Sequence, residues 1–164
     1  MLIGVISDTH NDFNGIIKAI KFFNLRNTDL VLHCGDICSP SAAKKFAALN
    51  SGFKAVYGNN DIDRAELDNA ISPFGMISEG PFKFKVSGKL FAMTHSPFSV
   101  SSLIAEGNFD YVLYGHTHRP SIEKRGNVAV INPGEACGYR YGRKTVALID
   151  LESGKSEIFE YEFE

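Results

Sequence analysis

The sequence of 164 residues has no tryptophan, only three cysteines and no apolar run near the roughly 20 residues that span a bilayer. Cys34, Cys38 and Cys137 are too few, and odd in number, for a disulfide framework. The first twelve residues lack the basic segment and small-residue cleavage site of a secretory signal. We therefore expect reduced thiols, a cytoplasmic location and no membrane association.

The sequence also lacks a large excess of charge of either sign, since 17 basic and 19 acidic residues leave a net charge of −2. Such a balance gives no overall attraction to nucleic acid. With 44% hydrophobic and 22% charged residues, the composition excludes a disordered chain, a collagen-like fibre or a coiled coil. The chain has no repeat or linker, and its length suits one hydrophobic core, so we predict a single domain over residues 1–164.

The first half of the chain alternates apolar, β-branched runs with apolar residues at helical spacing. The runs predict strands over residues 2–7, 30–33 and 53–57. The helical spacing predicts helices over residues 14–24, 41–49 and 64–70. Each predicted strand ends in a short polar segment.

The second half is richer in strands. We predict a hairpin over 82–86 and 90–94, a helix over 99–106 and strands over 111–114, 128–132, 145–150 and 157–163. One open parallel sheet cannot hold all these strands comfortably. We therefore predict an α/β fold in which two sheets pack face to face as a β-sandwich flanked by helices, in four layers, αββα.

Residues that can bind metals follow five of the predicted strands. They are Asp8, His10, Asp36, Asn59, His95, His116 and His118. Because the carboxyl ends of neighbouring strands meet at one edge of a sheet, these side chains are expected to converge. The fifth histidine, His33, lies inside a predicted strand, and we interpret it as a core histidine or as support for a neighbouring ligand.

Each motif has an ordinary structural explanation when taken alone. Gly35-Asp36 and the segment 58–61 are common turn sequences, and histidines two apart also occur on surfaces. Cys34 and Cys38 have no second cysteine pair to complete a zinc site, so we interpret the cysteines as apolar side chains. The prediction depends on all the motifs occurring together in one order.

In that order the motifs resemble those of the calcineurin-like metallophosphoesterases, which read D-x-H, G-D, G-N-H-[DE], a lone His and G-H-x-H. Here they read Asp8-Thr9-His10, Gly35-Asp36, Gly58-Asn59-Asn60-Asp61, His95 and Gly115-His116-Thr117-His118. The resemblance extends over residues 2–134 and is greatest to the short bacterial and archaeal phosphodiesterase branch, which shares the Ile-Asn-Pro-Gly turn at 131–134. The fold of that family, a two-sheet sandwich flanked by helices, agrees with our prediction.

The resemblance implies two metal ions that share Asp36 as a bridging ligand. One set of ligands is Asp8, His10, Asp36 and His118, and the other is Asp36, Asn59, His95 and His116. Nitrogen and oxygen ligands without thiolate suit Mn²⁺, which we expect, with Ni²⁺, Fe, Co²⁺ or Zn²⁺ as alternatives. The implied activity is hydrolysis of a small phosphoester, above all a diester, by in-line attack of a hydroxide shared by the two ions.

One position departs from the family pattern. Asn60 stands where the family has a histidine thought to protonate the leaving oxygen, and an amide can donate a hydrogen bond but not a proton. General acid catalysis contributes about 10²–10⁴-fold, so we predict slow turnover of poor leaving groups and fair turnover of activated aryl diesters. Arg119, with Arg140 and Arg143, is predicted to form a substrate-binding rim, although solvated surface charge explains these residues equally well. Glu135 replaces the usual serine, which leaves the role of its loop open.

Two other functions compete with the enzyme. A protein-interaction scaffold is the alternative, because the retromer subunit of the same branch keeps this fold but works by binding partners. That lineage has lost some metal-binding histidines, whereas all seven ligand positions are filled here. Phe82 and Phe98, expected to be exposed, would serve such a partner or a homodimer contact. A mononuclear zinc module would leave three good ligands unused.

Overall fold

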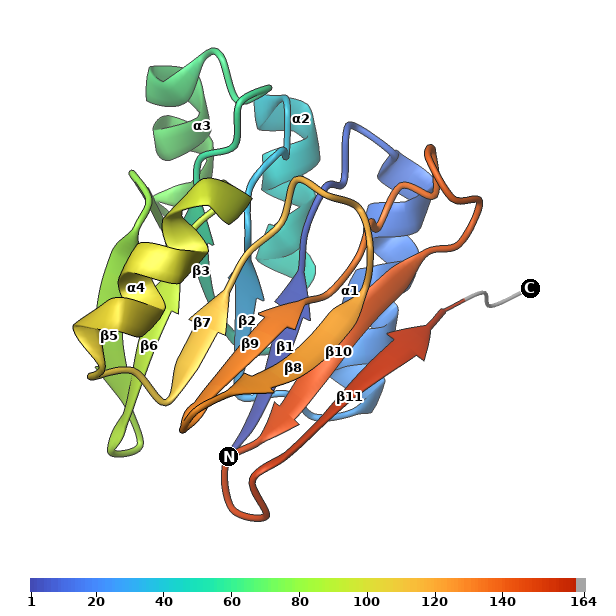
Figure 1. Ribbon diagram of the computed structural model, residues 1–164. Coiled ribbons are helices and arrows are strands. Elements are labelled where there is room, and N and C mark those ends of the chain that lie inside the picture. Colours follow the sequence, from blue (N-terminus) through green and yellow to red (C-terminus); the bar gives the residue numbers. More distant parts are fainter. Residues whose placement is uncertain (162–164) are drawn as a thin grey trace.

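The computed structural model describes residues 1–161, which form two mixed β-sheets packed face to face (Figure 1). The first sheet has six strands in the order β11 (Lys155–Glu160), β10 (Thr145–Asp150), β1 (Leu2–Ile6), β2 (Leu30–His33), β3 (Gly52–Val56) and β4 (Met76–Ser78). The second has five, in the order β5 (Phe82–Val86), β6 (Lys89–Met93), β7 (Tyr111–Leu113), β9 (Val128–Asn132) and β8 (Ser121–Arg125).

Helices cover the outer face of each sheet. The α-helices are α1 (Phe13–Leu25), α2 (Pro40–Ala43), α3 (Arg64–Ile71) and α4 (Val100–Glu106), and two short 3₁₀ helices, η1 (Lys44–Ala48) and η2 (Pro97–Ser99), lie next to α2 and α4. Figure 1 shows α4 on one side of the sandwich and α1, α2 and α3 on the other. The predicted fold, a two-sheet sandwich between helical layers, is confirmed. Among residues 1–161, no helix is both long and apolar enough to cross a membrane.

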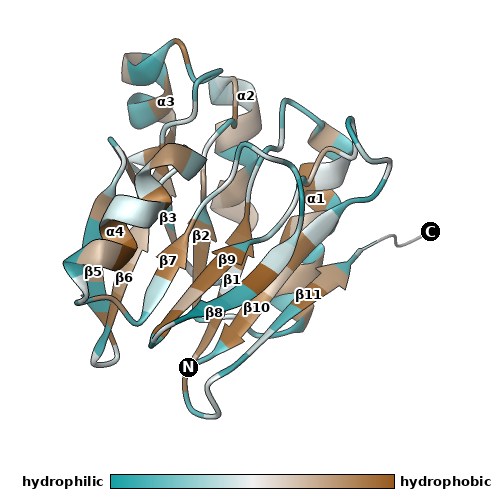
Figure 2. Ribbon diagram, viewed as in Figure 1, coloured by the Kyte–Doolittle hydropathy of each residue, from teal (hydrophilic) through white to brown (hydrophobic). Residues whose placement is uncertain are grey.

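Three apolar clusters hold these layers together. Residues such as Val5, Leu32 and Phe91 pack between the two sheets. Ile16 and Phe46 belong to the cluster between the first sheet and its helices, and a smaller cluster lies under α4. Figure 2 shows this pattern as mostly hydrophobic central strands beside more polar connecting loops. The apolar runs of the sequence are therefore explained by strands buried on both faces.

Parallel pairing determines where the chain presents its polar loops. β1, β2, β3 and β4 run parallel in the first sheet, and β6, β7 and β9 run parallel in the second. β10 and β11 add antiparallel strands beside β1. The loops that follow β1, β2, β3, β6 and β7 consequently meet at one end of the sandwich, as expected for carboxyl ends of parallel strands.

Some element boundaries were predicted wrongly. The helix expected over 41–49 is a single α-helical turn, Pro40–Ala43, followed by the 3₁₀ helix Lys44–Ala48. The strand expected over 157–163 covers Lys155–Glu160; Tyr161 lies beyond it, and Phe163 lies outside the described residues. Tyr161 is buried and donates a hydrogen bond from its hydroxyl to the carbonyl of Ala136, so its burial reflects a tertiary contact rather than strand alternation.

Two strands and two side-chain environments were missed. β4 has only three residues, and β8 is a mostly exposed edge strand with a single apolar side chain, so neither has a clear strand pattern. Phe82 is half-buried and stacks on Phe84 at a ring-centroid distance of 5.1 Å, whereas Phe98 is 89% exposed as predicted. Cys34 is a buried apolar residue, but the sulfur of Cys38 contacts a ring nitrogen of His10 at 3.5 Å.

Candidate metal centre

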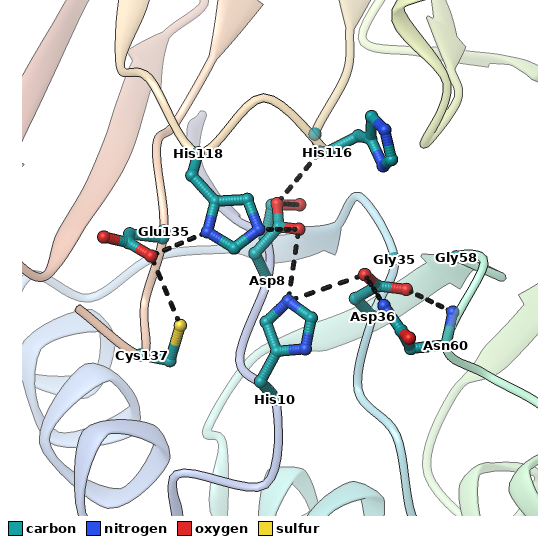
Figure 3. A network of polar contacts seen from close by, with 12 residues as sticks. Asp8, His10, Gly35, Asp36, Gly58, Asn60, His116, His118, Glu135 and Cys137 are labelled. Atoms are coloured by element: carbon teal, nitrogen blue, oxygen red, sulfur yellow. Dashed lines mark hydrogen bonds and ion pairs between the residues drawn. The ribbon is translucent and has the colours of Figure 1, made fainter. Parts of the chain in front are cut away.

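The seven predicted ligands lie together where the two sheets present their loops. Figure 3 shows Asp8, His10, Asp36, His116 and His118. Several adopt a left-handed backbone conformation that is uncommon for residues other than glycine. The φ angles are 54° at Asp8, 63° at Asp36 and 66° at His116. Such conformations cost energy and persist where the surroundings impose them, which happens often at functional sites.

Asp8, His10 and His118 form one half of the centre, which we call the Asp8 side. Oδ1 of Asp8 lies 3.2 Å from Nε2 of His118 and 3.6 Å from Nε2 of His10. The other carboxylate oxygen of Asp8 accepts hydrogen bonds from the hydroxyl of Ser7 and the backbone N–H of His116. One oxygen of Asp8 therefore faces two imidazoles while the other holds the carboxylate in place.

Asp36, Asn59, His95 and His116 form the other half, the Asp36 side. The side-chain oxygen of Asn59 lies 3.0 Å from Nε2 of His95 and 2.9 Å from Nδ1 of His116. Oδ2 of Asp36 lies 3.5 Å from Nε2 of His95 and also 3.5 Å from Nε2 of His10. Asp36 thus lies between the two sides, the position that a bridging ligand requires.

The outer nitrogens of two imidazoles have partners that fix their orientation. Nδ1 of His95 donates to the carbonyl of Cys34 at 2.8 Å, and Nδ1 of His118 lies 2.6 Å from Oε2 of Glu135. A ring that donates from Nδ1 keeps an unshared electron pair on Nε2 when it is neutral. The nitrogens that face the centre are therefore available as ligands.

Glu135 is the residue near the centre whose role the sequence left open. Its side chain is buried, and its carboxylate accepts hydrogen bonds from the backbone N–H groups of Arg140 and Tyr141. The same carboxylate contacts His118 and Cys137 (Figure 3). Burial would raise the pKa of Glu135, but these hydrogen bonds outweigh it and hold the pKa below its usual range. An ionised Glu135 therefore orients His118, an arrangement common behind metal-binding histidines.

Asp61 connects the two loops of the Asp36 side. Its buried carboxylate accepts hydrogen bonds from three backbone N–H groups, those of Asp36, Cys38 and Gly58. The loops approach so closely that a Cβ added at Gly58 would lie 2.1 Å from Oδ1 of Asp36. The sequence motifs thus include a glycine that leaves room and an aspartate that joins the loops.

The predicted substrate-binding residues surround the centre. The side-chain amide of Asn60 donates to Oδ2 of Asp36 at 2.7 Å, and Asn60 lines a hollow of about 460 Å³ above the centre together with Arg140. Arg119 lines a neighbouring groove. Arg143 also lines that groove, but its guanidinium is paired with the carboxylate of Glu160.

The electrostatics of the site favour a cation. Burial alone would raise the pKa of Asp8, but contacts with His10, His118 and Ser7 outweigh burial and lower it below its usual range. His33, the histidine that was not predicted as a ligand, is held neutral, because complete burial lowers its pKa to about 3. It lies 3.1 Å from the hydroxyl of Thr9 and accepts from the N–H of Gly35, as expected of a core histidine that supports the loops.

Two buried polar atoms show that the side chains present are suited to a metal. Oδ1 of Asp8 and Nε2 of His10 have no hydrogen-bond partner within residues 1–161. An unpaired buried polar atom is costly, and a cation placed between these two would satisfy both. In the described part of the chain, three groups of His, Cys, Asp or Glu atoms lie close enough to share an ion: Asp8–His10–His118, Asp8–Asp36–His95 and His118–Glu135–Cys137. The oxygens of Glu135 are already used by backbone N–H groups, so the first two groups fit best.

The comparison with known families agrees with this geometry. The chain belongs to the calcineurin-like phosphoesterase superfamily, whose domain model matches residues 1–154. Members of this superfamily hold divalent metal ions at sites of this kind, and the predicted resemblance is confirmed.

The chain is also similar to individual proteins over nearly its whole length. It is 38% identical to a phosphodiesterase of Methanocaldococcus jannaschii over 161 residues, which are 93% of this chain and 94% of the relative. A solved archaeal phosphodiesterase has a TM-score of 0.93 at 37% identity and covers 98% of this chain and 100% of its own. The Vps29 protein of Entamoeba histolytica, solved with Zn²⁺, has a TM-score of 0.72 at 19% identity over 98% of this chain and 92% of its own, which shows the shared fold alone.

Proposed function

We propose that this protein is a metal-dependent phosphodiesterase whose two divalent ions are held by the Asp8 side and the Asp36 side. The observation that carries the proposal is the convergence of four imidazoles and two carboxylates on one space, with Oδ1 of Asp8 and Nε2 of His10 left without partners within the described residues. The 38% identity to an archaeal phosphodiesterase supports the same activity.

The metal ions would supply charge neutralisation and a more acidic water. Bound divalent ions polarise phosphoryl oxygens and lower the pKa of water from 15.7 towards about 7. Nitrogen and oxygen ligands suit several first-row metals, and we propose Mn²⁺ among them. Asp36, which lies at equal distance from His10 and His95, would contribute to both ions.

The protein's own groups act on the rest of the substrate. In the net reaction an oxygen of water bonds to phosphorus while the ester bond to the leaving alcohol breaks, and a proton of that water passes to the alcohol or to solvent. Asn60 has one amide hydrogen on Asp36 and a second that can be donated to the leaving oxygen. The guanidinium of Arg140 has no ion pair or hydrogen bond with residues 1–161 and lines the same hollow, where it would bind the substrate phosphate.

The experiment is to remove metals with a chelator and to add back single divalent ions while measuring hydrolysis of bis(p-nitrophenyl) phosphate. We expect activity to return, with Mn²⁺ the most effective ion. Asp36→Asn should abolish the recovery because it weakens the ligand shared by both sides. The matched control is Asp68→Asn on the exposed face of α3, which should behave as the unaltered protein.

Failure to recover activity with any ion would overturn the proposal and favour the scaffold alternative.

The exposed side chain of Phe98, at the edge of the site, is our candidate for a homodimer contact. Light scattering tests that contact: Phe98→Ser should shift a dimer to a monomer. The cytoplasmic location remains a prediction from the sequence.

A further inference from the structure

A second concavity adjoins the metal centre, and His118 is the only predicted metal ligand among the described residues that line it. This groove has a volume of about 760 Å³ and is bounded by the segment 118–120, the segment 141–145 and the end of β11. It lies where the edge strands of the two sheets, β8 and β11, approach each other. Among residues 1–161, His118 is the one residue that lines both this groove and the hollow above the centre. A ligand that reaches past His118 would therefore enter the groove.

Arg119 is held in place in this groove with part of its guanidinium free. Its Nε donates to the hydroxyl of Tyr141 at 2.7 Å, and its Cζ lies 5.5 Å from the centroid of the Tyr141 ring. Within residues 1–161, neither terminal nitrogen of Arg119 has a hydrogen-bond or ion-pair partner. Such a guanidinium, oriented in advance by its contacts with Tyr141, is suited to binding an oxyanion through two hydrogen bonds.

The other arginine of the groove is not free. Nε and Nη2 of Arg143 donate to Oε2 of Glu160 at 2.8 and 2.6 Å. Two guanidinium groups and one carboxylate leave the groove with one positive charge, which is located on Arg119. Pro120 and Ile158 supply apolar surface beside it.

The guanidinium groups of Arg119 and Arg140 occupy different concavities. Arg140 lines the hollow above the centre, where the reacting phosphate would lie, whereas Arg119 lines the groove on the other side of His118. Among the described residues the two linings share only His118, so we assign a separate oxyanion to each guanidinium group. The arrangement fits a substrate with two oxyanions joined by a partly apolar unit.

We propose that the groove binds the retained arm of the diester and that this arm carries a second phosphate, which Arg119 recognises. The inference rests on the proposed phosphodiesterase activity and adds the class of substrate: a diester with a further phosphate on one arm, rather than a small diester with a single charge. The volume of the groove is in the range that encloses a nucleotide-sized arm.

Two substrates that differ only in this phosphate test the inference. They are the p-nitrophenyl ester of thymidine 5′-phosphate and the same ester with a second phosphate on the 3′ oxygen. We expect kcat/KM to be at least about tenfold higher for the second ester, mainly through a lower KM, because an arginine–phosphate pair is a strong charge-assisted contact. Arg119→Ala should reduce the ratio to about one, and Arg119→Lys should leave an intermediate ratio. Arg125→Ala, which removes a surface arginine outside the groove that is paired with Glu123, should keep the full ratio.

The failure of this inference can be distinguished from that of the proposed function. If bis(p-nitrophenyl) phosphate is hydrolysed but the two thymidine esters react equally well, or if Arg119→Ala keeps the preference, the inference is wrong and the activity stands. Binding of thymidine 3′,5′-bisphosphate, measured by calorimetry against thymidine 5′-phosphate, tests the groove without turnover. Tighter binding of the bisphosphate that depends on Arg119 supports the groove, and equal binding of the two nucleotides contradicts it.

Discussion

The two sides of the candidate centre differ in how firmly the fold holds them. The carboxylates of both sides are buried, but on the Asp8 side His118 is backed by the ionised carboxylate of Glu135. On the Asp36 side Asn59 and His116 are exposed, and His95 is backed by the neutral carbonyl of Cys34. A charged partner behind an imidazole makes its inner nitrogen a stronger ligand. We therefore expect the Asp8 side to bind its ion more tightly, while the Asp36 side lies open to substrate.

The largest effect should come from giving the Asp36 side the general acid that it lacks. With Asn60 unable to donate a proton, log kcat/KM should fall steeply as the pKa of the leaving alcohol rises. Asn60→His should raise the hydrolysis of alkyl diesters by about 10²–10⁴-fold and leave p-nitrophenyl diesters nearly unchanged. A series of diesters with graded leaving groups measures this. A flat dependence for the unaltered protein would show that another group already donates the proton.

The next largest effect concerns the loops of the Asp36 side. Asp61→Ala leaves three backbone N–H groups without their acceptor, so we expect a loss of about 3 kcal/mol in the free energy of unfolding. Urea denaturation measures this loss. Asp68→Ala, an exposed aspartate of α3, should change the free energy of unfolding by no more than about 0.5 kcal/mol. Equal stability of the two variants would mean that Asp61 does not join the loops.

The smallest of the three effects tests directly whether the Asp8 side binds its ion more tightly than the Asp36 side. Glu135→Gln removes the charge behind His118, and we expect about 10–100-fold weaker binding of the tighter ion, with the weaker ion little affected. Calorimetric titration of metal-free protein resolves the two events. Glu157→Gln, on the exposed part of β11, serves as the control. If Glu135→Gln weakens only the looser ion, the assignment of tight binding to the Asp8 side is wrong.

Much of the fold could be predicted because its buried strands have unmistakable apolar runs. β1, β2 and β7 are apolar on both faces, so their positions follow from the sequence. β4 and β8 lacked any such pattern, since one is very short and the other consists largely of exposed charged residues. The helix predicted over 41–49 is replaced partly by a 3₁₀ helix, a difference that periodicity over so few residues cannot reveal.

In the candidate site, too, some features could be predicted from the sequence and others could not. The convergence of the seven predicted ligands follows from the rule that parallel strands share an edge, whereas their roles as ligands remain a proposal. The contacts that hold these side chains depend on tertiary structure: Glu135 reaches His118 and Asp61 reaches Asp36 only after the loops have folded together. An acidic residue after the Asn-Pro-Gly turn, where relatives usually have serine, was the one signal for Glu135, and it could not show which side chain the carboxylate would meet.

The most direct test of the account is the number of ions bound by metal-free protein titrated with Mn²⁺, measured together with diesterase activity. We predict two ions per chain with unequal affinities, activity that appears only as the weaker ion binds, and loss of that activity in Asp36→Asn. Binding of a single ion with full activity, or two ions and unchanged activity in Asp36→Asn, would contradict a shared centre built around Asp36.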